Sequence, residues 1–377
     1  MERAFDPTAG AATGVAARWL VSPAYDLTFI IGSALLVLCA HASHAVLGSN
    51  LAVDLFVTML IGGPHLFATY TMTVMEPDFR RRYPRYARGA LLLPLIIVTL
   101  AIVNLTLLVT LFFFWASAHV IHQAAFVGDA YRFKDPRGWT RTSRAIDYAV
   151  LFTSLYPVAA GKLVRGEFQT GGRTLLFPDF LKVDWLPAVV WTAFAASLAA
   201  FALKTAWEIR TGRFHGPRTL HLAVAVALFS FTPTLRNLDV AFQGLNVWHS
   251  FQYLALVLYL NRLRGERGFI SSRFVRQVSR SGWWFYGVCL AFTLGAGVIF
   301  LTVLGLVVRL GAFATGASMP MIFYGTVFQG QHYFAFYSVI LSFLLIHYYF
   351  DHFLFLHADR RITPVFSPVQ SHAALAS

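Results

Sequence analysis

Residues 90–128 read ALLLPLIIVTLAIVNLTLLVTLFFFWASAHVIHQAAFVG, a run that contains no Asp, Glu, Lys or Arg. As one helix, with a rise of about 1.5 Å per residue, this run would be roughly 60 Å long, about twice the hydrocarbon thickness of a bilayer. We therefore predict that the run folds back on itself as a tight hairpin near Asn104, in the stretch VNLT. The first arm of such a hairpin is short, so a re-entrant helix is the alternative.

The whole chain shares this apolar character. Of its 377 residues, 57% are hydrophobic and 12% are charged, whereas soluble domains are about 25% charged. Several runs reach the roughly 20 apolar residues that span a bilayer. The net charge of +13 does not indicate nucleic-acid binding, because the basic residues lie mostly in short loops between apolar runs. The composition predicts an all-α, polytopic membrane helical bundle in contact with the lipid bilayer.

The loop charges suggest a topology. About ten transmembrane helices (9–10), with both termini cytoplasmic, place most of the 30 basic residues in cytoplasmic loops, as the positive-inside rule requires. Residues 1–24 and 358–377 are then cytoplasmic segments, and 25–357 form a single transmembrane domain of a multi-pass protein in the inner (plasma) membrane. The predicted spans lie near 25–47, 51–75, 90–104, 105–128, 145–162, 186–206, 219–235, 240–260, 283–309 and 331–357.

Histidines recur in the four predicted spans that run from outside to inside. Counted back from the inner helix ends, they lie roughly 8–16 Å deep at helical rise. Because ionisable groups are rare inside membranes and mark functional sites there, this shared depth predicts a metal site in the cytoplasmic half of the bundle. The predicted metal ligands are His65, His119, His122, His249, His347 and Asp351.

The spacing within each motif supports this prediction. His119 and His122 lie three residues apart, so both side chains share one helix face. Asp351 lies four residues after His347, where it could bind a metal or orient an imidazole. His352 points about 140° away from His347 on an ideal helix, so the two are not expected to bind one ion. His41 and His44, at the outer end of the first span, are a separate candidate pair.

A polar stripe follows one face of the span that carries His249. Its spacing of three or four residues points it into the bundle or a wet cavity, and it suits supporting or relay roles beside the ligands. Before His65, Gly62 and Gly63 precede Pro64, which lacks an N–H and leaves the Leu60 carbonyl without its usual donor. The predicted supporting or relay residues are Asn246, Gln252, Tyr253 and His352.

The chemistry of such a site follows from its ligands. Neutral imidazoles suit zinc, copper and iron, and Fe(II) held by histidines, with or without one carboxylate, leaves positions open for oxygen. A metal placed inside the bilayer makes sense for a substrate that dissolves there. We therefore expect Fe(II), with another transition metal as the alternative, and O₂-dependent oxidation of a lipophilic small molecule.

Four segments also resemble a known family. In order, GGPHLF (62–67), SAHVIHQAAF (117–126), VWHSFQYL (247–254) and LIHYYFD (345–351) are similar to the membrane motifs of the bacterial and archaeal β-carotene 15,15′-dioxygenases. The resemblance implies a polytopic enzyme with a non-haem iron, O₂ as co-substrate and cleavage of a carotenoid to retinal. By it, the ligands would be His65, His119 or His122, His249 and His347. Thr69 stands where that family carries an acid.

Other functions fit the same residues. A transporter or proton-coupled carrier could use the stripe from Asp239 to Tyr253 and the His347–Asp351 pair as a relay. A haem-binding membrane protein would need two imidazoles that face each other across about 4 Å, at the iron–nitrogen distances typical of histidine. An assembly factor without chemistry is a further alternative.

Overall fold

The structure is a computed structural model, and it describes residues 19–135, 140–170, 172–316 and 332–356. Most of the two predicted cytoplasmic end segments, 1–24 and 358–377, therefore lies outside the described residues. The chain is 83% helical with almost no strand, which confirms the all-α prediction. One two-residue antiparallel pair, β1 (Gln169–Thr170) with β2 (Arg173–Thr174), lies in a connection between helices.

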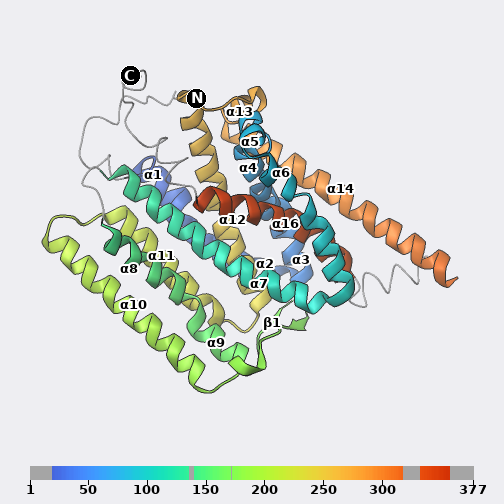
Figure 1. Cartoon of the computed structure of the whole chain (residues 1–377), viewed down its shortest axis with the longest axis horizontal. Helices are drawn as coiled ribbons and strands as arrows, with labels where there is room; N and C mark the ends of the chain where they lie inside the picture. Colours follow the sequence, from blue (N-terminus) through green and yellow to red (C-terminus); the bar gives the residue numbers. More distant parts are fainter. Residues whose placement is uncertain (1–18, 136–139, 171, 317–331, 357–377) are drawn as a thin grey trace.

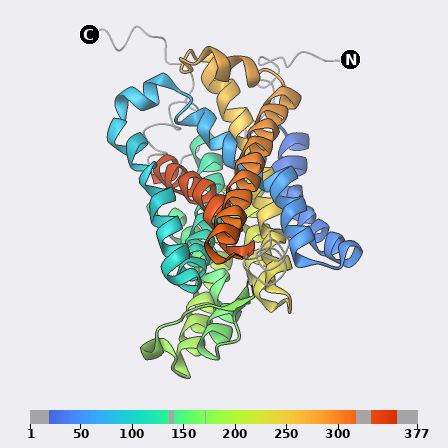
Figure 2. The same ribbon diagram turned by 90° about the vertical axis from the view of Figure 1, so that its right-hand side faces the viewer.

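The helices divide into a central part and a peripheral part (Figures 1 and 2). The long α12 passes through the middle, where it packs against α2, α3 and α4, while α7 packs along α16 and α10 lies outermost beside α8 and α9. The helices are α1 Pro23–Tyr25, η3 Asp26–Ile31, η4 Gly32–Leu36, α2 Val37–Leu47, α3 Asn50–Val57, η5 Thr58–Gly62, α4 Gly63–Met72, α5 Pro77–Arg82, α6 Pro84–Gly89, α7 Leu92–Lys134, α8 Arg141–Ser154, α9 Tyr156–Val164, η6 Asp179–Leu181, α10 Trp185–Arg210, α11 Gly216–Phe231, η7 Thr232–Thr234, α12 Leu238–Glu266, α13 Arg273–Val278, α14 Gly282–Thr315 and α16 His332–Leu356.

The predicted break in the long apolar run is present. Within α7, Asn104 has non-helical backbone angles of φ −158° and ψ 86°, and the helix bends sharply there into two arms (Figure 1). The Asn104 side chain accepts a hydrogen bond from the Leu107 N–H over 2.9 Å, in the manner of a helix N-cap. An asparagine inside an apolar run thus ends one arm and begins the next.

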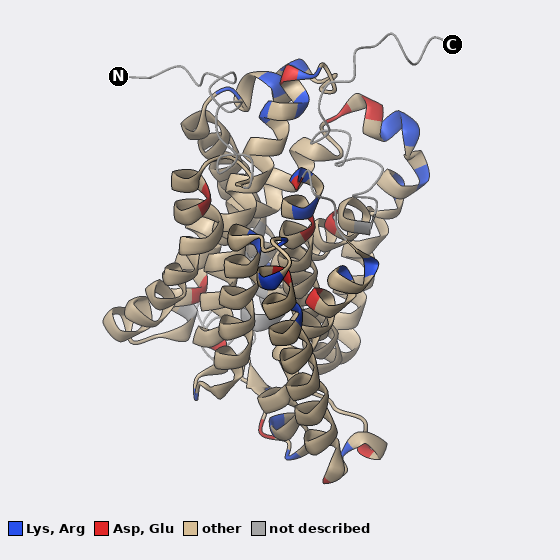
Figure 3. Cartoon of the chain, turned by 90° about the vertical axis from the view of Figure 1, so that its left-hand side faces the viewer, with Lys and Arg blue, Asp and Glu red and all other residues tan. Residues whose placement is uncertain are grey.

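The outer helices carry apolar side chains on their exposed faces. Leu203 on α10 is 73% exposed and Phe313 on α14 is 90% exposed, as expected for surfaces that lipid solvates. Lys and Arg gather at the end of the bundle that holds α5, α6 and α13, and others lie at mid-height and at the opposite end (Figure 3).

Six helices in the described part of the chain are long and apolar enough to cross a membrane. The predicted number of ten, the cytoplasmic location of the termini and the membrane itself remain predictions. The predicted spans without such a helix are shorter, interrupted or more polar; one of them breaks between α8 and α9 at Leu155. The six candidates are Pro23–Leu47, Ala52–Met72, Pro84–Lys134, Trp185–Arg210, Gly282–Val303 and Tyr337–Phe355.

A buried network of ion pairs, which the sequence did not predict, joins α7, α8, α10 and α11. Asp147 accepts hydrogen bonds from Arg132 and Lys204, and Glu208 accepts two from Arg218, at 2.9 and 2.7 Å. All five side chains are at least nine-tenths buried. Because each buried charge meets an opposite one, the network can hold the peripheral helices against α7.

Candidate metal centre

The segment before His65 brings α4 close to α14. The π-helical η5 ends at Gly62, and Pro64 lies in the first turn of α4. The Leu60 carbonyl, for which Pro64 offers no N–H, accepts a hydrogen bond from the Tyr286 hydroxyl over 2.8 Å. A Cβ at Gly63 would lie 2.2 Å from Thr293 Cγ2, so α14 packs this closely because residue 63 is glycine. His65 is thereby fixed at the interior end of α4.

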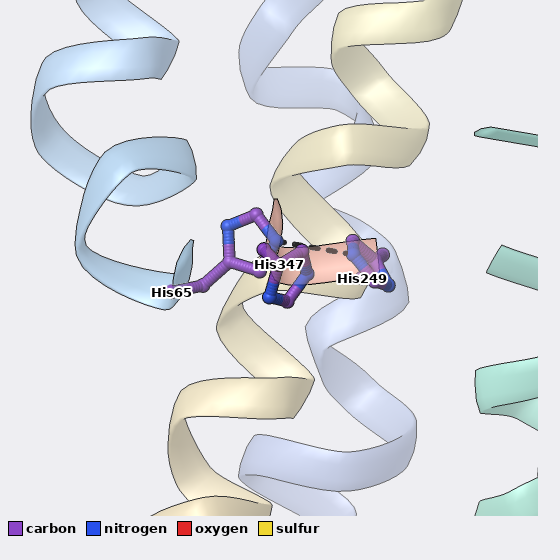
Figure 4. Close-up of side chains that lie close together, drawn as sticks. All are labelled: His65, His249 and His347. Carbon is purple, nitrogen blue, oxygen red and sulfur yellow. Dashed lines mark hydrogen bonds between the residues drawn. The ribbon is translucent and has the colours of Figure 1, made fainter. Parts of the chain in front are cut away.

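Four imidazoles meet in the interior, each from a different helix. The ring centroids lie 4.9 Å apart for His65 and His249, 4.9 Å for His249 and His119, 5.0 Å for His119 and His347, and 4.6 Å for His347 and His65. Across this closed ring, His249 and His347 are 6.5 Å apart. All four side chains are buried, and Figure 4 shows three of them pointing toward one another. The four rings thus surround one small volume.

Two overlapping sets of side chains have the spacing of metal ligands. One set is His65, His249 and His347; the other is His119, His347 and Asp351; within each set one ligand atom per residue lies within 4.8 Å of the others. At metal–ligand distances of about 2.0–2.2 Å, neighbouring ligand atoms should be about 2.8–3.6 Å apart. The two Nε2 atoms of His65 and His249 are 3.2 Å apart, which falls in that range.

The second set is close to the same spacing. Asp351 Oδ2 lies 3.5 Å from His347 Nε2 and 3.9 Å from His119 Nε2. The larger of these distances exceeds the expected range by a few tenths of an ångström. A small movement of the His119 ring would therefore complete a three-ligand site.

Several buried atoms of this group lack hydrogen-bond partners. In the described part of the chain, the buried side-chain atoms without a partner include both ring nitrogens of His119, Nδ1 of His249, Nε2 of His347 and Oδ2 of Asp351. The Nε2 atoms of His65 and His249 are instead paired with each other. Leaving a buried polar atom unpaired costs about 1–3 kcal/mol, and such atoms are rare in folded proteins. Their concentration in one volume fits a bound cation, so the donor set passes this test for a transition metal.

Neighbouring hydroxyl groups orient the ligands. His347 donates from Nδ1 to Thr69 Oγ1 over 2.6 Å, and Thr69 donates to Asp351 Oδ1 over 2.8 Å. Tyr253 donates to the same carboxylate oxygen over 2.6 Å. These bonds leave His347 Nε2 and Asp351 Oδ2 free to bind a metal, which is the usual arrangement around metal-bound histidines.

His65 is held in the same way. Its Nδ1 hydrogen-bonds to the Gly62 carbonyl and lies 2.9 Å from Ser250 Oγ. Because Nδ1 carries the proton in that bond, Nε2 faces His249 as an acceptor. The sequence did not predict that Thr69 or Ser250 supports the site, since a hydroxyl residue in an apolar helix carries no signal for such a role.

Other predicted residues lie beside the group, outside both ligand sets. His122 belongs to neither group. Although the sequence predicts that it shares a helix face with His119, its Nδ1 lies 3.3 Å from that of His352. Asn246 donates to Gln243 over 3.0 Å and accepts from Ser250. His41 contacts the Val37 carbonyl, and neither it nor His44 belongs to a possible metal-binding group in the described part of the chain.

Gln252 lies near His249 and connects neighbouring helices by hydrogen bonds. It donates to the Ile30 carbonyl over 2.6 Å and accepts from Gln123 over 3.2 Å, while Gln123 also donates to the His249 carbonyl. Gln252 thus links η3, α7 and α12 at the level of the site. Tyr253, by contrast, hydrogen-bonds directly to the candidate ligand Asp351.

Two cavities reach the group of imidazoles, one at His249 and the other at His65. One, of about 100 Å³, extends to His249 and Tyr348 and has almost wholly apolar walls, including Phe113, Ala116 and Leu155. Tyr348 stacks on His119 with ring centroids 4.1 Å apart. The other cavity, of about 70 Å³, extends to His65 and has more polar walls. The group therefore has an apolar approach and a polar approach.

The fold and this group define an all-α protein with membrane-length helices and a buried histidine–carboxylate cluster. Comparisons with models of protein families, with curated proteins and with solved structures each find no match to this chain. Its function therefore has to be inferred from the geometry described above.

Proposed function

We propose that this protein is an integral-membrane non-haem iron oxygenase that acts with O₂ on a membrane-dissolved lipid, for which a carotenoid is the leading example. The observation that carries the proposal is the set His119, His347 and Asp351. Two imidazoles and one carboxylate with open positions are the ligands of non-haem Fe(II) oxygenases. His65 and His249 would supply further nitrogen ligands on the opposite side of His347.

The residues around the ligands suit oxidation of an apolar substrate. Fe(II) held in this set would supply the binding and activation of O₂. Thr69 and Tyr253 orient Asp351 and His347, so the ligand geometry does not depend on solvent. The burial of the ligands excludes bulk water, which protects reactive species from side reactions.

The apolar cavity would receive the substrate. Its walls carry no charged side chain, and it reaches the site at His249 and Tyr348. A cavity of about 100 Å³ admits one segment of an extended chain rather than an entire lipid. The rest of a long substrate would remain in the bilayer beside α7 and α9, whose residues line the cavity.

The alternatives fit the site less well. A haem needs about 4 Å between two facing nitrogens, but His65 Nε2 and His249 Nε2 are 3.2 Å apart, and the other two imidazoles occupy the space beside them. A proton-coupled carrier is favoured by the polar cavity, which Asp239 and Gln243 line. A carrier of that kind would not require the ligand atoms of His119 and Asp351 to be unpaired.

Metal analysis tests the proposal. Protein purified in detergent should contain close to one iron per chain, His347→Ala should lose it, and His122→Ala should keep it, since His122 lies outside both ligand sets. Co-expression with a carotene pathway should bleach the pigment in cells with the unaltered protein and not in cells with His347→Ala. Purified protein that is folded but contains no metal would refute the proposed oxygenase function.

A further inference from the structure

The proposed metal ligands are sealed from solvent. His65, His119, His249, His347 and Asp351 are each no more than 2% exposed. A cation that binds to them must therefore cross the interior of the bundle. The two cavities that reach the histidines are the available approaches in the described structure.

The apolar cavity is a poor route for an ion. A divalent cation would lose its hydration there with few polar atoms to replace it, and the desolvation of an unpaired ion in an apolar medium costs many kcal/mol. The polar cavity has Asp54, Asp239, Gln243 and Asn246 in its wall and ends at His65. Its volume of about 70 Å³ has room for a few water molecules.

Hydrogen bonds join the start of this polar cavity to the metal centre. Asp54 Oδ1 accepts from Gln243 over 2.8 Å, Gln243 Oε1 accepts from Asn246 over 3.0 Å, and Asn246 Oδ1 accepts from Ser250 over 3.0 Å. Ser250 Oγ in turn lies 2.9 Å from His65 Nδ1. A carboxylate oxygen on α3 and amide oxygens on α12 therefore follow one another toward the first imidazole.

The two carboxylates in the wall of this cavity lie at its more exposed part. Asp54 and Asp239 are partly exposed, whereas Gln243 and His65 are buried. Asp239 accepts hydrogen bonds from Asn50 over 3.1 Å and from Thr170 over 2.6 Å, so it is held in place beside the cavity.

We infer that the metal ion loads through the polar cavity, attracted by Asp54 and Asp239 and passed along the oxygens of α12 to His65. This inference rests on the proposed metal centre and adds a role for residues that do not touch it. Separate routes for ion and lipid also explain why one histidine cluster has two cavities, one with almost wholly apolar walls and one whose wall also carries two carboxylates.

The rate of metal uptake tests the route independently of catalysis. Metal-free protein in detergent is mixed with Co²⁺, a spectroscopic substitute for Fe²⁺ with similar ligand preferences, and the growth of its ligand-field absorption is followed together with the final cobalt content. The double variant Asp54→Asn/Asp239→Asn should take up cobalt at least about tenfold more slowly, the lower range of electrostatic steering, and reach the same final content.

Two further variants complete the experiment. Thr58→Phe, which narrows the polar cavity without removing a carboxylate, should also slow uptake, while Ala116→Leu in the apolar cavity should leave its rate unchanged. Unchanged rates in both polar-cavity variants, or slow uptake in Ala116→Leu alone, would overturn the route while the metal centre stands. If the unaltered protein binds no cobalt at equilibrium, the proposed metal centre fails and the loading route fails with it.

Discussion

Thr69 Oγ1 lies 2.6 Å from His347 Nδ1 and 2.8 Å from Asp351 Oδ1, so one hydroxyl group fixes two side chains that we propose as ligands. The carboxylate of the group comes from Asp351, one helical turn after His347 on α16. Thr69 and Tyr253 donate the hydrogen bonds that orient it.

Removing this hydroxyl should weaken metal binding without unfolding the protein. Thr69→Val keeps the shape of the side chain but leaves His347 Nδ1 without its acceptor, and loss of such a supporting bond typically lowers metal affinity 10–100-fold. Thr69→Ser retains the hydroxyl and should bind nearly as tightly as the unaltered protein. Competition with a chelator measures both affinities, and equal affinity in the valine variant would exclude the orienting role.

The contact between α4 and α14 predicts a specific packing defect. Gly63→Ala would place a methyl group 2.2 Å from Thr293 Cγ2, so α14 must move, and overpacking of this kind costs about 1–3 kcal/mol. Gly295→Ala is the matched control on α14, because a Cβ there meets nothing within 4 Å. Thermal unfolding in detergent should show a lower midpoint for Gly63→Ala than for the control. Similar midpoints would show that the interface accommodates the added methyl group without loss of stability.

Several features of the fold could be predicted because they depend on local composition. The bend at Asn104 follows from a run too long for one membrane crossing, interrupted by a residue that caps helices. Proline has no backbone N–H, so the sequence alone predicts that the Leu60 carbonyl lacks its usual hydrogen-bond donor. The sequence could not show that the hydroxyl of Tyr286, more than 200 residues away, donates to this carbonyl instead.

The sequence predicts how deep each residue of the site lies along its helix, but not how each helix is rotated about its own axis. Depth in the membrane selected His65, His119, His122, His249, His347 and Asp351, and the structure brings all of them except His122 together. Their role as metal ligands remains a prediction. Helix rotation, in contrast, depends on packing against neighbours, which is why His122 faces His352 rather than the cluster. The hydroxyl of Thr69 became meaningful only when α4 and α16 were placed side by side.

The buried ion pairs should matter for stability more than any exposed pair. Asp147→Ala would leave Arg132 and Lys204 buried with one partner fewer, and breaking a buried pair in this way costs about 3–5 kcal/mol. Asp78→Ala removes the exposed partner of Arg81 and should leave the unfolding midpoint unchanged. Chemical denaturation of both variants in detergent measures the difference, and equal stability would mean that the network contributes little to holding α8 and α10.

The apolar cavity predicts a variant that separates substrate access from metal binding. Ala116 is fully buried in the cavity wall, so Ala116→Leu should narrow the cavity while the ligands keep their positions. We expect iron content to stay near that of the unaltered protein and carotenoid bleaching during co-expression to fall at least tenfold, about the effect of 1.4 kcal/mol on a rate.

The matched control for this variant is Ala193→Leu, which adds the same side chain on the exposed face of α10 and should change neither quantity. Loss of iron in Ala116→Leu would show that the substitution disturbs the metal centre, and the cavity would then be tested with Ala159→Leu on its other wall. Full bleaching in both cavity variants, with iron retained, would mean that the lipid reaches His249 from another direction, because the added methyl groups fill the space through which the substrate is proposed to pass.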